Sequence, residues 1–121
     1  MKKLLNTALI LNLLTDGPVG LFLLFSPQSF LPADQIEGLF WVRNYGVAAL
    51  AVASMIFWAW SSRDSYKAMG VALGFLLAFH TVLCMVLITA GGQMVGAVLH
   101  FVLATLFIIL YLNRAKLCDS Q

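Results

Sequence analysis

The chain has 121 residues, of which 62% are hydrophobic and 10% are charged, and its formal net charge is +2. A soluble domain carries about 25% charged residues, so this composition excludes an ordinary soluble fold, and the apolar content excludes intrinsic disorder. The basic residues are divided among separate short segments, which does not indicate a nucleic-acid partner.

The sequence predicts an all-α membrane protein, an antiparallel bundle of four transmembrane helices in a single domain over residues 1–121. Residues 68–113 contain no Asp, Glu, Lys or Arg, and this stretch is about twice the ~20 residues that one spanning helix needs. Serine, proline and glycine clusters interrupt the apolar sequence and are typical of turns. They place the predicted spans at about 4–25, 35–60, 66–90 and 94–112.

The first span contains the tripeptide Asp16-Gly17-Pro18. Pro18 cannot donate to the carbonyl of Leu14, so the helix should kink there. No small-x-small cleavage site follows the apolar stretch, and we therefore expect a retained helix rather than a cleaved signal peptide. At the start of the second span, Asp34 and Glu37 approximate a capping box.

The positive charges predict the orientation of the bundle, because basic residues favour the cytoplasmic side. The loops at 26–34 and 91–93 contain no Lys or Arg. Six of the seven basic residues fall on the opposite side: Lys2, Lys3, Arg63, Lys67, Arg114 and Lys116. Both termini are therefore expected to be cytoplasmic, with the protein integral to a bacterial inner (plasma) membrane.

Small residues recur at helical spacing and predict close helix packing, which replaces the hydrophobic effect as the packing force in lipid. An alternative is homodimerisation through one such stripe. The three sets are Gly70, Gly74 and Ala78 on the third span, Gly92, Gly96 and Ala104 on the fourth, and Gly46, Ala49 and Ala53 on the second.

Polar residues within the spans form the candidate ligand-binding site: Asp16, Arg43, Asn44, His80 and His100. At ~1.5 Å per residue, the four ionisable ones lie roughly 9–15 Å from the outer helix ends. A charge in lipid costs at least ~2.5–3.5 kcal/mol, so such residues usually pair or face a wet cavity. We expect an ion pair between Asp16 and Arg43 in a polar pocket in the outer half of the bilayer.

Each of these residues also has a purely structural explanation. Asp16 could cap a broken helix, and Arg43 could extend to the outer head groups. Asn44 and the two histidines could make interhelical hydrogen bonds. Asn12 shares a helix face with Asp16, and Tyr45 is expected to belong to an aromatic belt.

The two cysteines, Cys84 and Cys118, have no spacing typical of a redox motif or a zinc site. Cys84 falls within a span and Cys118 in the C-terminal tail, so a disulfide between them is not expected. The sequence predicts no metal site.

The chain resembles the small DoxX-like integral membrane proteins. The resemblance is carried by four helices in about 120 residues, by Ser26-Pro27 closing the first span, and by Arg43-Asn44-Tyr45-Gly46 early in the second. It implies the four-helix fold, and the group includes quinone-linked redox subunits. The Asp16-Gly17-Pro18 tripeptide and the intramembrane histidines depart from that pattern, so no catalytic residue is carried over.

These patterns favour a membrane protein that binds a lipid- or quinone-like amphiphile. One alternative is a subunit of a quinone-linked redox enzyme or other membrane enzyme, in which His80 or His100 moves a proton. A haem between the two histidines is a less favoured variant. Another alternative is a structural subunit of a homo-oligomer or larger membrane complex. A transporter is disfavoured because no polar residues continue through the inner half.

Overall fold

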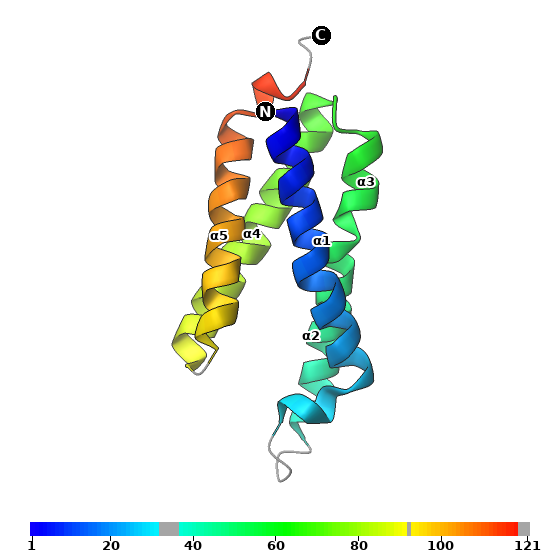
Figure 1. Ribbon diagram of the computed structural model, residues 1–121, viewed down its shortest axis with the longest axis vertical. Coiled ribbons are helices and arrows are strands. Elements are labelled where there is room, and N and C mark those ends of the chain that lie inside the picture. Colours follow the sequence, from blue (N-terminus) through cyan, green and yellow to red (C-terminus); the bar gives the residue numbers. More distant parts are fainter. Residues whose placement is uncertain (32–36, 92, 119–121) are drawn as a thin grey trace.

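Four long apolar helical segments run alongside one another, and the N-terminus lies at the same end of the bundle as the last turn of the chain (Figure 1). The computed structural model describes residues 1–31, 37–91 and 93–118. The α-helices in this part of the chain are α1 (Lys2–Phe25), α2 (Gly38–Ala53), α3 (Met55–Ser61), α4 (Tyr66–Ala90) and α5 (Met94–Leu112). Short 3-10 helices follow α1 (η1, Pro27–Phe30) and α5 (η2, Arg114–Lys116).

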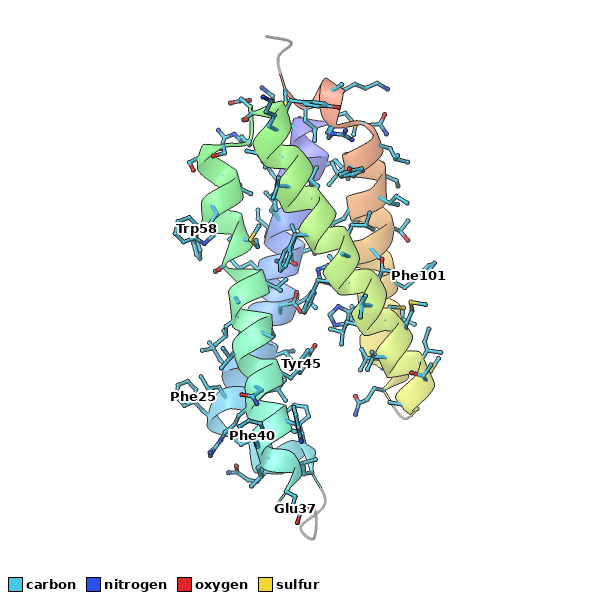
Figure 2. The ribbon with its side chains drawn as sticks, turned by 180° about the vertical axis from the view of Figure 1, so that it is seen from behind. Phe25, Glu37, Phe40, Tyr45, Trp58 and Phe101 are labelled. Carbon is cyan, nitrogen blue, oxygen red and sulfur yellow. The ribbon has the colours of Figure 1, made fainter. Side chains whose placement is uncertain are left out.

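Each of the four segments is long and apolar enough to cross a membrane: Lys2–Phe25, Gly38–Ser61, Tyr66–Ala90 and Met94–Leu112. The expectation of an all-helical, membrane-type chain is therefore confirmed. Large aromatic side chains project from the outside of the bundle (Figure 2), and Phe25, Phe40, Trp58 and Phe101 are 64–74% exposed. An outer surface of this kind suits lipid tails and would be unfavourable in water.

The second span is one apolar segment made of two helices. α2 ends at Ala53 and α3 begins at Met55, and the hydroxyl of Ser54 donates to the carbonyl oxygen of Ala51 at 2.7 Å. A serine that bonds back to its own helix often bends it. By contrast, α1 runs unbroken through Pro18. The capping residue expected at Asp34 lies outside the described residues.

The helices associate as two hairpins, α1 with α2 and α4 with α5. At the crossing of α1 and α2, the backbones touch. A Cβ atom added to Gly46 would lie 2.9 Å from the carbonyl oxygen of Gly20, so only glycine fits there. Ala49 and Ala53, which follow Gly46 on the same face, are buried. This stripe on the second span therefore packs against α1, as the spacing of small residues predicts.

The two hairpins meet at one end of the bundle and diverge toward the other (Figure 1). We call the end with the N-terminus, the α3–α4 turn and η2 the termini end, and the end with η1 and the start of α5 the loop end. Beyond the hairpin contacts, α1 also touches α5 and α3, and α3 touches α4. The half of the bundle nearer the termini end is the termini half, and the other is the loop half.

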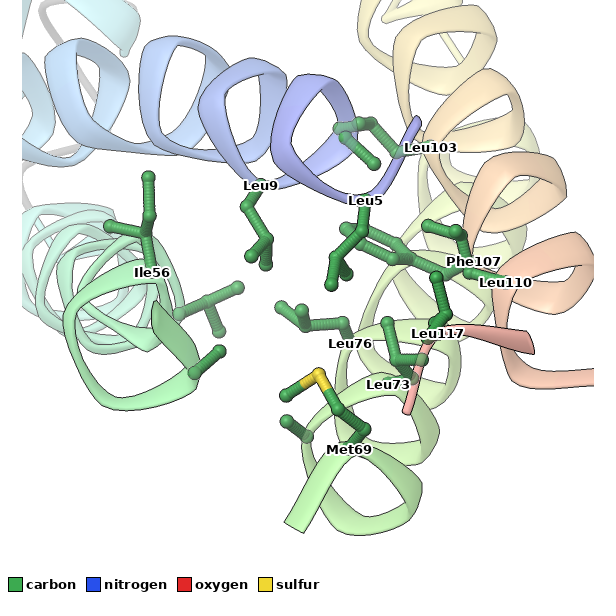
Figure 3. Close-up of a cluster of buried hydrophobic side chains, with 14 of the residues drawn as sticks. Leu5, Leu9, Ile56, Met69, Leu73, Leu76, Leu103, Phe107, Leu110 and Leu117 are labelled. Carbon is green, nitrogen blue, oxygen red and sulfur yellow. The ribbon is translucent and has the colours of Figure 1, made fainter. Parts of the chain in front are cut away.

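A single apolar core fills the termini half (Figure 3). Its largest members come from all four spans: Leu5, Leu9, Ile56, Met69, Leu73, Leu76, Leu103, Phe107 and Leu110. Leu117, which follows η2, is fully buried against the same cluster. The guanidinium of Arg114 lies over the rings of Tyr66 (4.7 Å) and Tyr111 (4.4 Å) and joins the start of α4 to the end of α5.

A cluster of buried polar groups as the candidate functional site

Four buried polar side chains meet where the apolar core ends and the hairpins begin to diverge. Asn12 and Asp16 are four residues apart on α1, which places them on one face of the helix. They are 0% and 2% exposed, His80 on α4 is 0% exposed, and His100 on α5 is 5% exposed. We call these four residues the polar cluster.

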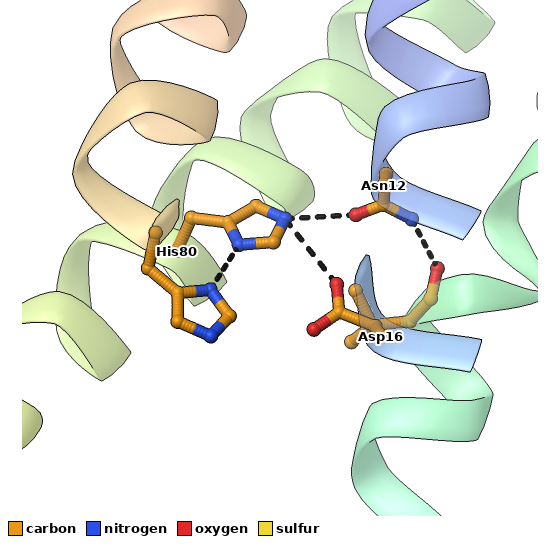
Figure 4. Close-up of polar contacts among 5 residues, drawn as sticks. Asn12, Asp16 and His80 are labelled. Atoms are coloured by element: carbon orange, nitrogen blue, oxygen red, sulfur yellow. Dashed lines mark hydrogen bonds and ion pairs between the residues drawn. The ribbon is translucent and has the colours of Figure 1, made fainter. Parts of the chain in front are cut away.

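His80 is the centre of the polar cluster (Figure 4). Its Nδ1 atom lies 2.8 Å from Nδ1 of His100, and its Nε2 atom lies 2.8 Å from Oδ1 of Asn12. Nδ2 of Asn12 donates to the carbonyl oxygen of Val52 at 3.1 Å. One continuous chain of hydrogen bonds thus connects α5, α4, α1 and α2.

Aromatic rings hold the imidazole of His80 in place. The ring meets that of His100 edge to edge, with centroids 5.1 Å apart and planes 25° apart, and it stacks on the ring of Phe107 with centroids 5.4 Å apart. Phe79 meets His80 edge-on at 5.3 Å. Since Phe107 belongs to the apolar core, the cluster is built directly onto the packed half of the bundle.

Asp16 is the member whose polar atoms are least satisfied. Its Oδ2 atom lies 3.7 Å from Nε2 of His80, which is too long for a hydrogen bond. Among the described residues, this buried oxygen has no hydrogen-bond partner. Tyr45 projects on the α4 side of α2 (Figure 2). A buried carboxyl oxygen without a donor is costly, which marks Asp16 as a position where a partner is missing.

The structure brings together Asp16, His80 and His100, but not Arg43 and Asn44, which are exposed on α2. The expected ion pair between Asp16 and Arg43 is wrong, because no ion pair joins these two described residues, and the basic side chain that approaches Asp16 is His80, at 3.7 Å. Whether any of the five residues binds a ligand stays a prediction.

The register between α1 and α2 explains the error. Asn12 meets Val52 and Gly20 meets Gly46, so Asp16 lies at the level of about Ala49. Arg43 is about six residues, or ~9 Å, farther toward the loop end. It also points the wrong way, since residues two apart on a helix differ by about 200° in direction, which sets Arg43 opposite Tyr45. The depth estimates assumed that all helices end in one plane, and they carried no information on direction.

Comparisons with family models, with curated proteins and with solved structures give no match to this chain. The site therefore has to be interpreted from its own geometry. The direct contact between the two Nδ1 atoms does not fit a haem between the histidines, because the iron and the porphyrin would have to separate the rings. No group of three or more metal-ligating side chains is found among the described residues.

Sequence reasoning missed the role of Asn12, which was noted only as sharing a face with Asp16. The four-residue spacing on α1 was the available signal. It could not reveal the partner of Asn12, which is a backbone carbonyl just before the break at Ser54. Whether Tyr45 belongs to an aromatic belt stays a prediction.

Proposed function

We propose that this integral membrane protein binds an amphiphilic small molecule, lipid- or quinone-like, whose polar head reaches the polar cluster. The observation that carries the proposal is the buried Oδ2 atom of Asp16, which has no hydrogen-bond partner in the described structure. A ligand head group would supply that partner. A few convergent polar groups in apolar surroundings are the usual form of a small-molecule site.

The divergence of the hairpins supports entry from the lipid rather than from water. Leu83 and Leu87, which continue the His80 face of α4 toward the loop end, are only partly buried. An alkyl tail lying between the hairpins would cover such surfaces. The DoxX-like resemblance is consistent with this architecture and with a quinone as one candidate ligand.

The basic residues support an orientation with both termini in the cytoplasm, in a bacterial inner membrane. Ion pairing brings Lys2 and Asp64 together at the termini end, so the charged ends of α1 and of the α3–α4 turn lie on one side. On this orientation the ligand enters from the outer leaflet. Cysteines placed at Ser29 and at Ser61, in a Cys84→Ala, Cys118→Ser background, test it: an impermeant thiol reagent added to intact cells should label the first and spare the second.

A second candidate function is proton transfer within a membrane enzyme. The hydrogen bond between His80 and His100, next to the carboxyl of Asp16, favours it. Histidines connected in this way can move a proton to or from a bound substrate. A structural role, in which the cluster only joins the four spans, is the remaining alternative.

Mass spectrometry of the protein purified in mild detergent tests the binding proposal. We expect an amphiphile to co-purify with the unmodified protein and with Phe101→Leu, which alters an exposed neighbour of His100. His100→Leu should lose it while retaining its helical content. If His100→Leu retains the molecule until the protein unfolds, the cluster is structural and the proposal is wrong.

A further inference from the structure

We infer that the polar cluster selects amphiphiles whose head group donates a hydrogen bond, as a hydroxyl does, over heads that only accept. This inference rests on the proposed function and names the chemistry of its ligand. It follows from the direction of the hydrogen bonds through the cluster, which can be assigned one atom at a time starting from α2.

The chain of hydrogen bonds has a fixed end at Val52. A backbone carbonyl can only accept, so the amide of Asn12 must turn its NH₂ group toward Val52. This orientation is imposed by the partner and does not depend on telling nitrogen from oxygen. Oδ1 of Asn12, which can only accept, therefore faces Nε2 of His80 at 2.8 Å.

His80 must then carry its proton on Nε2. A neutral imidazole has one N–H donor and one acceptor nitrogen. His80 is completely buried, and the nearest carboxyl oxygen is 3.7 Å from it. A second proton would therefore place a charge in apolar surroundings without a hydrogen-bonded counter-ion, which is strongly unfavourable. Nδ1 of His80 is consequently an acceptor.

The same argument assigns the position of the proton on His100. Its Nδ1 atom lies 2.8 Å from the acceptor Nδ1 of His80 and must donate to it. Nε2 of His100 is left with a lone pair, and it has no hydrogen-bond partner among the described residues. Since His100 is the most exposed member of the cluster, this lone pair is the group that an incoming molecule meets.

Asp16 gives the cluster a second acceptor. A carboxyl group can accept hydrogen bonds whether or not it is protonated, and Oδ2 of Asp16 is unpartnered. A head group carrying only carbonyl or ether oxygens would bring lone pairs against Nε2 of His100. A hydroxyl would satisfy that atom, and a second hydroxyl could reach Asp16. Quinols have two such hydroxyls, and lipid alcohols such as diacylglycerol have one.

A matched pair of probes isolates the hydrogen-bond donor: 4-nonylphenol and its methyl ether, in which a methyl group replaces the hydroxyl hydrogen. The phenol should bind the purified protein in detergent at least about tenfold more tightly than the ether. A buried polar site discriminates strongly against a ligand that leaves its hydrogen-bonding groups unpaired. A second arm separates the sources of the hydroxyl by comparing a short-chain ubiquinol with its quinone, and diacylglycerol with its acetate.

His100→Asn provides the sharpest variant. The asparagine amide can still donate to Nδ1 of His80 but offers no acceptor where Nε2 stood. It should keep the melting temperature and lose the preference for the phenol, whereas Phe101→Leu should keep both. ¹⁵N NMR should show the proton of His100 on Nδ1.

The outcomes separate the two ideas. Equal binding of the phenol and the ether would leave the binding site in place and overturn the inference about the donor, as would a proton found on Nε2 of His100. If neither probe and none of the quinone, quinol and lipid ligands binds, the proposed function falls and the inference with it.

Discussion

The termini half and the loop half of the bundle are stabilised in different ways. In the termini half, side chains of all four spans meet in one apolar core around Phe107, Leu73 and Leu5. In the loop half, buried side chains lie within each hairpin: Leu23 of α1 packs at Gly46 of α2, and Cys84 and Ala97 are buried on α4 and α5. The polar cluster lies at the boundary between the two.

The difference shows that the loop half depends on backbone contact within each hairpin. The touching backbones of Gly20 and Gly46 hold α1 to α2, and the described residues form no central core that connects this pair to α4 and α5 there. Among the described residues, the two hairpins are therefore joined by the core, the polar cluster and the ion pair between Lys2 and Asp64 at the termini end. The mutations below test this division, from the largest expected effect to the smallest.

Phe107→Ala should destabilise the protein most. The side chain is fully buried in the core and stacks on His80. The free energy of unfolding should fall by an amount that approaches but does not exceed the ~3–5 kcal/mol typical of a soluble core. The cost of the cavity remains in a bilayer, whereas the transfer of the side chain from water does not contribute there. Thermal unfolding in detergent measures it. Phe101→Ala, on the exposed face of the same helix, is the control and should leave the midpoint unchanged.

Gly46→Ala should separate α1 from α2 in the loop half. The added Cβ atom would meet backbone at 2.9–3.0 Å, and overpacking of this kind costs roughly 1–3 kcal/mol. In Gly74→Ala the new atom would lie 3.5 Å from the ring of Tyr111, an ordinary contact, so stability should hold or rise slightly. Equal losses in both variants would argue against backbone contact as the specific cause.

Asn12→Leu tests the hydrogen bonds at the boundary. It removes the bonds to His80 and Val52. Interhelical hydrogen bonds in membranes contribute ~0.6 kcal/mol on average and ~1.7 at most, so a loss of about 1–2 kcal/mol is expected. A double-mutant cycle with His80→Leu should show coupling, whereas a cycle with the exposed Thr81→Val should be additive. Additivity in the first cycle would contradict the assigned hydrogen bond.

The ion pair at the termini end should have the smallest effect. Nζ of Lys2 lies 2.8 Å from Oδ1 of Asp64, and this hydrogen bond and charge lower the pKa of Asp64. A lowered pKa in the folded state stabilises above the ordinary pKa and loses its effect as the pH falls through the lowered value. Asp64→Asn should therefore lower the melting temperature slightly at pH 7 and by less at pH 2, and salt should weaken the difference. A larger change in melting temperature at acidic pH than at pH 7 would contradict the lowered pKa of Asp64.

The sequence was sufficient to predict the helices but not their rotation. Hydropathy and turn residues located the four spans, and α4 and α5 begin and end where the pattern placed them. The break at Ser54 was missed because one serine in an apolar run carries no strong signal. Whether a serine bonds to its own helix depends on neighbouring packing.

For the candidate site, the type of residue was more informative than its estimated depth. Buried histidines and Asp16 were identifiable because polar groups are costly in lipid. The Arg43 prediction used the same cost argument, but an exposed arginine near a helix end avoids that cost by reaching the interface. Only the register set by Gly20 and Gly46 distinguishes the two cases, and a contact between two helices cannot be deduced from either one alone.

The hairpin arrangement has a consequence for how the protein is assembled. Each hairpin satisfies its own backbone hydrogen bonds and buries small residues between its own two helices. Each can therefore insert into the bilayer already folded and associate with the other hairpin afterwards. Two polypeptides divided within the turn at 62–65, made separately in the same cell, should therefore reassociate through the core. The hydrogen bond from His80 to Asn12 would then fix the register of one hairpin against the other.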